Sequence, residues 1–253
     1  MAPIELLQRW GRSTVDEAEH LRGHAQLARS NAHKYAADLC RELGIDDPQN
    51  HIVMGPTKDL KRILEKAASQ CGGRVRDITD ICRLTIVCDD PRTLAKARKL
   101  FFEGRGRDFH DDMAERSGVT FHTEPKDYIS QPKRWGYMAI YLRMQADLGG
   151  GRTLPFELQI THRGMYNHAY PQTHKLYESI REEMEIVEAK GGRVPDDLSD
   201  HAKDVLSEIL DIHRDGAKQY GLLPLVSGAF PQLNKSKPRT DGQEVDILPP
   251  AIG

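Results

Sequence analysis

The chain has 253 residues, of which 38% are hydrophobic and 29% charged, and its formal net charge is −2. This length suits one sizeable domain or one domain with appendages. The near-neutral charge gives no reason to expect a nucleic-acid or membrane partner, so a local cluster has to account for any such interaction.

The sequence predicts a cytoplasmic protein with no membrane partner. The first residues are charged (Glu5, Arg9, Arg12) and lack the apolar segment of a secretory signal. No apolar run approaches the length needed to span a bilayer. Export by a system that uses no signal peptide stays compatible with this pattern. The absence of any C-x-x-C pair predicts free, buried thiols in a reducing compartment for Cys40, Cys71, Cys82 and Cys88.

Residues 1–48 are predicted to form an N-terminal helical segment. Their apolar residues recur at helical spacing, and Gly44 suits the C-terminal cap. A short strand is expected over residues 51–55. In the helix predicted after it, Lys58, Arg62 and Lys66 recur every four residues and therefore share one face. That face is either a solvated basic stripe or a binding surface for phosphate.

The next predicted element is a strand over residues 74–88, which becomes apolar and β-branched toward its end. An amphipathic helix is predicted over residues 91–103, and it follows Asp90-Pro91. A polar loop over residues 104–118 contains the dipeptide His110-Asp111, and residues 119–125 form another predicted strand.

The most informative stretch covers residues 126–160 and predicts a lysine-bearing loop followed by two strands. Because alternate side chains of a strand share a face, each of these strands has one apolar face and one polar face. The polar faces carry Tyr137 and Tyr141 on the first strand, and Glu157 and Gln159 on the second. A carboxylate, an amide, two tyrosines and nearby lysines suit a nucleotide, which is a polyanion with a flat ring.

Two helices and a tail are predicted after this stretch. The first helix covers about residues 173–190 and is expected to pack on the back of the sheet, with His174 and Tyr177 on one side. A C-terminal helix is expected within residues 193–222. Residues 223–253 contain five prolines and no periodicity, which predicts an extended or flexible tail.

Four of these stretches together resemble the synthetase domain of the RelA/SpoT family. KDYISQPKRWGY (126–137) resembles the family's loop-and-strand signature, and PFELQI (155–160) resembles its E-I-Q-I strand. GPTKDLKRILEK (55–66) and DICRLTIVC (80–88) are similar to the family's phosphate-binding segment and to its D-I-x-G-x-R-I-I-C run. The resemblance implies an α+β fold of nucleotidyltransferase-like type within residues 49–192, with a mixed five-stranded sheet flanked by helices.

The resemblance also implies an activity and its residues. Members of the family transfer pyrophosphate from ATP to the 3′-hydroxyl of a guanine nucleotide with the help of Mg²⁺. By this resemblance Glu157 is the base or positions it, Asp80 is the principal Mg²⁺ ligand with Glu157 as the second, and Tyr137 stacks on the acceptor base. The residues expected to contact nucleotide or phosphate are Lys58, Arg62, Lys66, Arg83, Lys126, Lys133, Tyr137 and Gln159.

The chain departs from the family pattern around this site. Pro56 and Thr85 replace the two arginines that stack on adenine in the family, and Arg83 stands at a glycine position. The family's G-Y-R-S-I-H reads GYMAIY here, and the arginine after E-I-Q-I is displaced to Arg163. Because the carboxylates and lysines remain, we expect the fold and the phosphoryl chemistry to persist while the substrates differ.

Three functions stay open from the sequence. The first is an alarmone synthetase with GDP, GTP or an adenine nucleotide as acceptor. The second is a toxin-like enzyme that pyrophosphorylates the 3′ end of tRNA, and the third is a module that only binds a nucleotide or a partner protein. An antitoxin or a second copy of the chain is a further expected type of partner. The tRNA alternative would use a basic surface of Arg92, Arg98, Lys99, Arg105 and Arg107.

Overall fold

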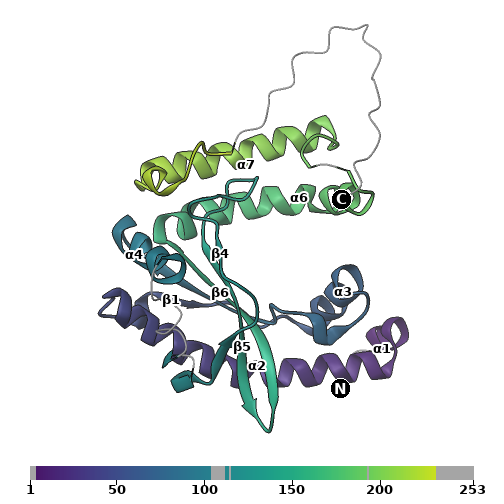
Figure 1. Ribbon diagram of the computed structural model, residues 1–253. Coiled ribbons are helices and arrows are strands. Elements are labelled where there is room, and N and C mark those ends of the chain that lie inside the picture. The colour runs from purple at the N-terminus through teal and green to yellow at the C-terminus, as the bar shows by residue number, and fades with distance from the viewer. Residues whose placement is uncertain (1–3, 104–111, 114, 193, 232–253) are drawn as a thin grey trace, which may run out of the picture.

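The computed structural model describes residues 4–103, 112–113, 115–192 and 194–231 (Figure 1). Its longer helices are α1 (Ile4–Trp10), α2 (Arg12–Leu43), α3 (Leu60–Gln70), α4 (Pro91–Phe102), α6 (Tyr170–Ala189) and α7 (Asp200–Gln219). Its strands are β1 (Ile52–Met54), β2 (Cys82–Cys88), β3 (Val119–Phe121), β4 (Lys126–Asp127), β5 (Ile140–Gly149) and β6 (Arg152–His162). Within the described residues, no helix combines the length and apolar character that crossing a bilayer requires.

The strands form one mixed sheet in the order β1-β2-β6-β5-β3, with β4 also paired to β5. β2 and β6 run parallel, and the other pairs are antiparallel. The sheet has six strands instead of the expected five, because Lys126–Asp127 at the start of the lysine-bearing loop pairs with β5. The expected α+β architecture, a mixed sheet flanked by helices, is confirmed.

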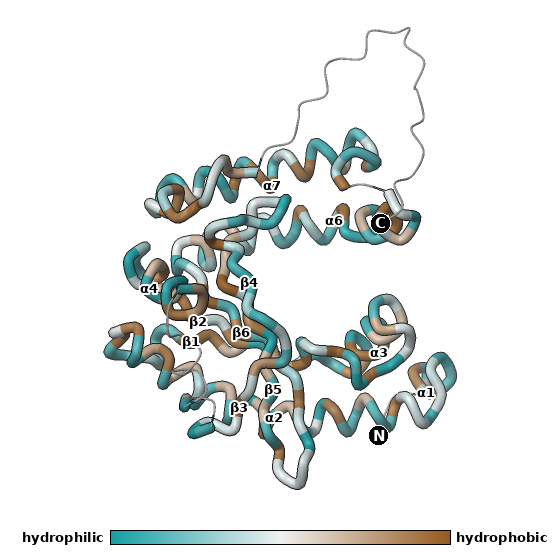
Figure 2. The backbone as a smooth tube through the Cα atoms, in the orientation of Figure 1, coloured by the Kyte–Doolittle hydropathy of each residue, from teal (hydrophilic) through white to brown (hydrophobic). Residues whose placement is uncertain are grey.

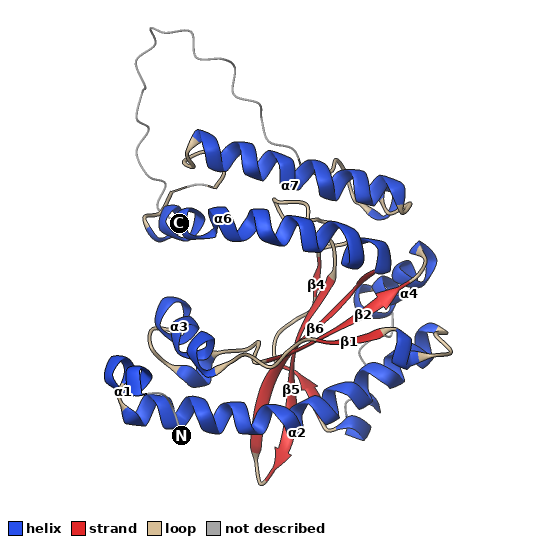
Figure 3. Ribbon diagram, turned by 180° about the vertical axis from the view of Figure 1, so that it is seen from behind, coloured by secondary structure: helices blue, strands red, loops and turns tan. Residues whose placement is uncertain are grey.

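The main hydrophobic core lies between α2 and the apolar face of the sheet. α2 contacts β2, β5 and β6, whose fully buried Leu84, Leu142 and Leu158 lie at paired positions. Figure 3 shows α2 on one side of the sheet and α6 and α7 on the other. The polar face of the sheet is therefore turned toward α6. The buried side chains of α2 in this core include Ala25, Ala28, Ala32, Tyr35 and Leu39.

A second, smaller core joins α6 to α7. Ile180 and Met184 of α6 pack with Ala202, Leu206 and Ile209 of α7, and each is at most 4% exposed. Figure 2 shows apolar stretches along both helices. The C-terminal helix predicted within residues 193–222 is present as α7. The α6–α7 hairpin thus has its own packing and lies across the polar face of the sheet.

Two predicted elements have different bounds in the structure. The N-terminal helix is interrupted at Gly11 (φ 77°), which separates α1 from α2, whereas Gly44 caps α2 in the left-handed conformation as predicted. The strand predicted over residues 74–88 is wrong in its first half, since β2 begins at Cys82. Residues Val75–Asp77 form a 3₁₀ turn instead, where the side chains of Arg74 and Asp77 pair locally.

All four cysteines are free. Cys40, Cys82 and Cys88 are buried, and burial raises the pKa of their thiols to about 12, 11 and 12 respectively. Cys71, at the C-terminal end of α3, is partly exposed. The predicted tail begins with a 3₁₀ turn at Leu223–Leu225, and residues 232–253 lie outside the described part of the chain.

Candidate functional site

A cleft of about 1020 Å³ opens on the polar face of the sheet. α3 and the start of β2 form one wall, and α6 forms the opposite wall with a contribution from α7. The floor comes from β2, β5 and β6. The volume lies at the upper end of the roughly 300–1,000 Å³ typical of small-molecule sites, so there is room for more than a single small metabolite.

The floor of the cleft follows from the strand register. Glu157 of β6 lies between Arg83 of β2 and Arg143 of β5. In the next row on the same face, Gln159 lies between Thr85 and Tyr141. The predicted alternation is therefore confirmed for Tyr141, Glu157 and Gln159. Tyr137, which was predicted on the same strand as Tyr141, precedes β5 instead, because β5 begins at Ile140. The apolar side chains of these strands point to the α2 core: Ile140, Leu142, Met144, Phe156, Leu158 and Ile160.

Glu157 is held in place by hydrogen bonds on both of its oxygens. The Tyr141 hydroxyl donates to Oε2 at 2.7 Å, and the Gln159 amide nitrogen donates to Oε1. Gln159 in turn accepts from the Tyr137 hydroxyl at 2.5 Å. The Glu157 side chain belongs to a residue only 7% exposed. Burial and the Glu157 charge raise the pKa of Tyr141, so this tyrosine remains a hydrogen-bond donor at neutral pH.

Asp80 lies two residues before β2, between two lysines. Its Oδ2 accepts from Lys66 Nζ at 2.6 Å and from Lys58 Nζ at 3.0 Å. Burial alone would raise the pKa of Asp80, but the two lysines outweigh burial and hold the pKa below its ordinary value. The other oxygen, Oδ1, is buried and has no hydrogen-bond partner among the described residues. An ionised carboxylate with one unshared oxygen therefore borders the cleft.

This arrangement fits the Mg²⁺ ion that the family resemblance implies. Mg²⁺ prefers carboxylate oxygens, and it is commonly bound by one or two carboxylates plus substrate phosphates and water. Asp80 supplies the unshared Oδ1, and Glu157 lines the same cleft. Among the described residues, no group of three or more His, Cys, Asp or Glu side chains could hold a metal alone, so substrate oxygens would have to complete the coordination.

The cations of the α3 wall do not all come from the helix on which they were predicted. Lys58, Arg62 and Lys66 do not share one helix, because Asp59 caps the N-terminus of α3 by accepting from the Arg62 backbone at 2.9 Å. Lys58 therefore precedes the helix and reaches Asp80 from the loop. Arg62 and Arg83 are exposed and line the cleft without any ion pair among the described residues. The basic stripe is thus a wall of the cleft and is not only a solvated surface.

Lys133 lies in an aromatic cage within the lysine-bearing loop. Its Nζ lies 4.8 Å from the ring centre of Tyr128, 5.1 Å from Trp135, 5.4 Å from Tyr137 and 5.7 Å from Tyr141, all within cation–π range. Burial lowers the pKa of Lys133, Glu157 opposes this shift, and the charges of Lys126 and Arg143 reinforce it. Lys133 lines the cleft.

Two predicted contacts of this loop need qualification. Lys126 is exposed on β4 opposite Tyr141 and does not line the cleft, although its charge reaches Lys133. Tyr137 lines the cleft, but its ring stacks on Tyr170 with centres 5.0 Å apart. A nucleotide base that stacks on Tyr137 would therefore compete with Tyr170 and with the Lys133 ammonium, which lies over the same ring at 5.4 Å.

The α6 wall is where the sequence interpretation placed its helix wrongly. α6 begins at Tyr170 and faces the cleft instead of the back of the sheet, so His174 and Tyr177 line the wall opposite α3. His174 is well exposed, with 67% of its side chain accessible. The helical spacing that identified α6 could have shown that His174 and Tyr177 share one side of the helix. It could not show which face of the sheet the helix covers. The cleft residues missed from sequence on α6 and α7 include Tyr170, Glu178, Arg181, Glu182, Glu185 and His213.

Other predicted features lie away from the cleft. Arg92, Arg98 and Lys99 of α4 do not line it, and Arg98 pairs with Asp127 at 2.6 Å and with Glu103 at 2.9 Å. Arg105, Arg107 and the dipeptide His110-Asp111 lie outside the described residues. The described part of the basic surface expected for tRNA, Arg92, Arg98 and Lys99, therefore lies outside the cleft, and Arg98 is already ion-paired.

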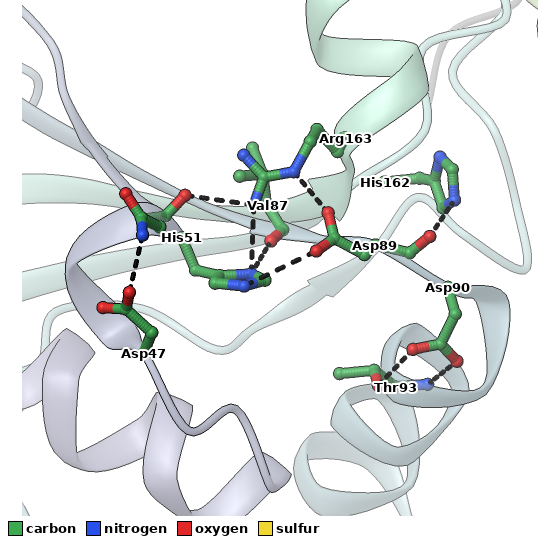
Figure 4. A network of polar contacts seen from close by, with 9 residues as sticks. Asp47, His51, Val87, Asp89, Asp90, Thr93, His162 and Arg163 are labelled. Atoms are coloured by element: carbon green, nitrogen blue, oxygen red, sulfur yellow. Dashed lines mark hydrogen bonds and ion pairs between the residues drawn. The ribbon is translucent and has the colours of Figure 1, made fainter.

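The displaced arginine after β6, Arg163, also lies outside the cleft. Figure 4 shows a polar network where β2 and β6 end. Arg163 pairs with Asp89 and donates to the backbone oxygen of Asn50 at 3.0 Å. Asp89 also faces His51 at 3.5 Å, and its backbone oxygen contacts His162 at 3.1 Å. These residues do not line the cleft, so Arg163 cannot replace a cleft arginine from this position.

Comparison with known proteins identifies solved structures that share this fold. No protein-family model and no curated protein matches this sequence. Among solved structures, the fold is that of the small alarmone synthetases. Small alarmone synthetase 1 from Bacillus subtilis matches 83% of this chain and 95% of its own, with a TM-score of 0.52 and 16% identity. The fold that the sequence resemblance implied is therefore confirmed.

Two further solved structures match less closely. A GTP pyrophosphokinase family protein from Streptococcus pneumoniae covers 87% of this chain and 90% of its own, with a TM-score of 0.49 and 16% identity. The complex between the Type VI effector Tas1 and its immunity protein contains a chain that matches 79% of this one and 96% of its own, with a TM-score of 0.46 and 17% identity.

Proposed function

We propose that this protein is a pyrophosphokinase that transfers a pyrophosphate group from ATP to the 3′-hydroxyl of a guanine or adenine nucleotide. One observation carries the proposal: Glu157 and Asp80, which are far apart in sequence, line the same cleft beside lysines. Glu157 is oriented by Tyr141 and Gln159, and Asp80 is ionised between Lys58 and Lys66 with one oxygen unshared.

The reaction needs a base, a bound polyphosphate and an oriented acceptor. The acceptor's 3′-oxygen attacks the β-phosphorus of ATP, the bond from that phosphorus to the oxygen of the α-phosphate breaks, and AMP leaves. The proton of the hydroxyl group goes to Glu157, whose carboxylate the Tyr141 and Gln159 hydrogen bonds keep in one orientation. A positioned general base contributes about 10²–10⁴-fold to rate.

The polyphosphate is proposed to lie along the α3 wall. Lys58, Arg62, Lys66 and Arg83 supply cations there. Asp80 would hold Mg²⁺ through its unshared oxygen, with Glu157 as the second protein ligand. When bound, Mg²⁺ neutralises phosphate charge that builds up during the transfer.

The acceptor is proposed to lie along the lysine-bearing loop. Lys133 offers a charge that is poorly solvated and ringed by aromatic side chains, which suits contact with an acceptor phosphate. Lys126 adds charge from outside the cleft. Tyr137 is proposed to contact the acceptor base through its ring, beside Tyr170 and Lys133. Its hydroxyl holds Gln159, so base binding and the orientation of Glu157 are linked through one side chain.

A transfer assay tests the proposal. Purified protein with Mg²⁺ and ATP labelled at the γ-phosphate should move the label to at least one of GDP, GTP or ADP, whereas transfer to tRNA alone would support the toxin-like alternative. Glu157→Gln should lower the rate by about 10³-fold because it removes the base without changing the shape of the side chain. Glu182→Gln, on the opposite wall, is the matched control and should change the rate by less than about threefold. Absence of transfer to every acceptor would refute the proposal and favour a binding module.

A further inference from the structure

The part of the lysine-bearing loop that enters the cleft is a tight turn. The Gly136 amide donates to the Lys133 carbonyl at 2.6 Å, and the Lys133 amide donates to the Tyr137 carbonyl at 3.1 Å. Gly136 has φ +83°, a conformation that favours glycine because other residues have a Cβ atom. The turn therefore sets the positions of Lys133 and Tyr137 relative to each other, with the Lys133 ammonium 5.4 Å from the Tyr137 ring centre.

This turn rests on α7, and the contacting residue His213 also lines the cleft. His213 Nδ1 is 2.8 Å from the Trp135 carbonyl oxygen, and the residue is only 2% exposed. A Cβ atom added at Gly136 would lie 2.7 Å from the Cβ of His213, closer than packed carbon atoms can come. The backbone of the turn and this one histidine are thus in direct contact.

Three further contacts hold the loop from the same C-terminal part of the chain. Arg134 donates to the Val194 carbonyl at 2.8 Å. The Trp135 ring packs on the α6–α7 core, with its centre 5.7 Å from that of Tyr177. The Ser227 amide donates to the Ser130 carbonyl at 2.7 Å. Of the loop side chains that line the cleft, only Trp135 takes part in these contacts, and Lys133 and Tyr137 do not.

We infer that His213 is a positioning residue for the nucleotide site: by holding the Trp135 carbonyl and filling the space beside Gly136, it fixes the turn that presents Lys133 and Tyr137. The inference rests on the proposed function where it calls Lys133 and Tyr137 acceptor-binding residues. It makes the C-terminal helix α7 a working part of the site, although α7 contributes none of the carboxylates or lysines in the cleft.

The protonation state of His213 suits this role. A carbonyl accepts, so Nδ1 must carry a proton and donate to Trp135. Nε2 faces the Thr173 hydroxyl at 3.3 Å, and the Tyr170 ring meets the imidazole edge to face at 5.7 Å. Burial lowers the pKa of His213 to about 4, so the ring is neutral at pH 7 and keeps one fixed donor. Replacing it with an apolar side chain leaves the Trp135 carbonyl without this partner.

Two substitutions separate the hydrogen bond from the packing. His213→Asn keeps an amide donor near the position of Nδ1, whereas His213→Leu keeps an apolar volume and removes the donor. Both are made with Trp10→Phe, so that Trp135 is the single tryptophan. We expect acrylamide to quench Trp135 fluorescence at least about twofold more efficiently in His213→Leu than in its parent. His213→Asn should stay within the error of the parent.

Steady-state kinetics give the functional readout. In His213→Leu the KM for the acceptor nucleotide should rise by about tenfold or more, the cost of leaving a buried carbonyl unpaired and the turn loose. The KM for ATP should change by less than about twofold, since the α3 wall is untouched. His213→Asn should restore most of the acceptor KM. Should His213→Leu fail to fold, His213→Gln replaces it, because its amide lies one carbon too far to reach the Nδ1 position.

The outcomes distinguish this inference from the proposed function. Equal quenching in His213→Leu and His213→Asn would overturn the inference even if the parent protein transfers pyrophosphate normally. Equal increases in both KM values would also overturn it, because that pattern belongs to general destabilisation. If no version of the protein transfers pyrophosphate, the proposed function fails. The quenching comparison, together with GDP binding measured by titration of Trp135 fluorescence, still decides whether His213 positions the loop.

Discussion

The two walls of the cleft are both built around a helix, but they carry opposite net charge. The α3 wall presents the cations Lys58, Arg62, Lys66 and Arg83 against two carboxylates, Glu65 and Asp80, and Asp80 is enclosed by two of the lysines. The α6 wall presents the glutamates Glu178, Glu182 and Glu185, and its one arginine, Arg181, pairs with Glu178 at 2.7 Å and Glu185 at 3.8 Å. A polyphosphate entering this cleft is therefore drawn to one side and repelled from the other.

This difference gives the ligand a direction. Phosphates should follow the α3 wall toward Asp80, while the acceptor should follow the loop toward Glu157. A long nucleic acid has phosphates along its whole length and would have to pass the acidic wall at a cost. We therefore expect a mononucleotide acceptor and not the 3′ end of tRNA.

The largest expected difference between the two walls is in the transfer rate, when one carboxylate is neutralised on either wall in separate variants. Asp80→Asn should lower the transfer rate by about 10²–10³-fold, since it weakens the proposed metal ligand and leaves Lys58 and Lys66 without a counter-charge. Glu185→Gln makes the same chemical change on α6 and should alter the rate by less than about threefold. Rates at saturating Mg²⁺ measure this, with circular dichroism as the folding control. Equal losses in the two variants would remove the functional contrast between the walls.

Removing one cation from each wall sharpens the same contrast. Lys66→Met should lower kcat/KM for ATP by about 10²-fold, because a charged hydrogen bond to phosphate and the partner of Asp80 are lost together. Arg181→Met should cost less than about threefold, since that guanidinium already pairs within its own helix. The measurement is the initial rate at several ATP concentrations, from which kcat/KM is obtained. A larger loss from Arg181→Met would place the phosphates on the α6 wall.

Acid should act on the α6–α7 side before it acts on the α3 wall. Burial lowers the pKa of His213 from 6.5 to about 4, so the folded state binds the proton less well than the unfolded state. Its contribution to stability is complete above pH 6.5 and is lost as the pH falls toward 4. Between pH 7 and pH 5 the loss amounts to about 2 kcal/mol.

Urea unfolding of the parent and of His213→Asn at both pH values checks this. The unfolding free energy of the parent should fall by about 2 kcal/mol more than that of the variant. The lowered pKa of Asp80 acts in a separate window: that carboxylate loses its stabilising charge only as the pH falls below its ordinary value of 3.8. An identical fall in both proteins would mean that His213 is not the group that titrates.

The floor of the cleft could be predicted from the sequence because strand periodicity is local. The positions of Glu157 and Gln159 on one face, opposite Leu158, follow from alternation alone and agree with the observed register. The resemblance added the pairing of Glu157 with Asp80 in one site, which alternation cannot give. Gly44 was also predictable, since a helix end that needs positive φ selects glycine.

The walls were harder to predict because they depend on distant packing. Spacing suggested that Lys58 belongs to a helix, but the Asp59 cap starts α3 two residues later. Spacing also identified the helix α6 but not its place in the fold. The face of the sheet that α6 covers depends on the separate core that α6 shares with α7. His213 resembles any histidine on an apolar helix face, and its partner is a backbone oxygen at Trp135, which leaves no trace in side-chain composition.

The state of the cysteines has a practical use. Three thiols are buried and stay protonated at neutral pH, so a maleimide dye should react chiefly with Cys71 in the native protein, without any cysteine having been removed. That residue ends α3. A fluorophore attached there would report, through energy transfer from Trp135 across the cleft, how far the walls approach each other when a nucleotide is added.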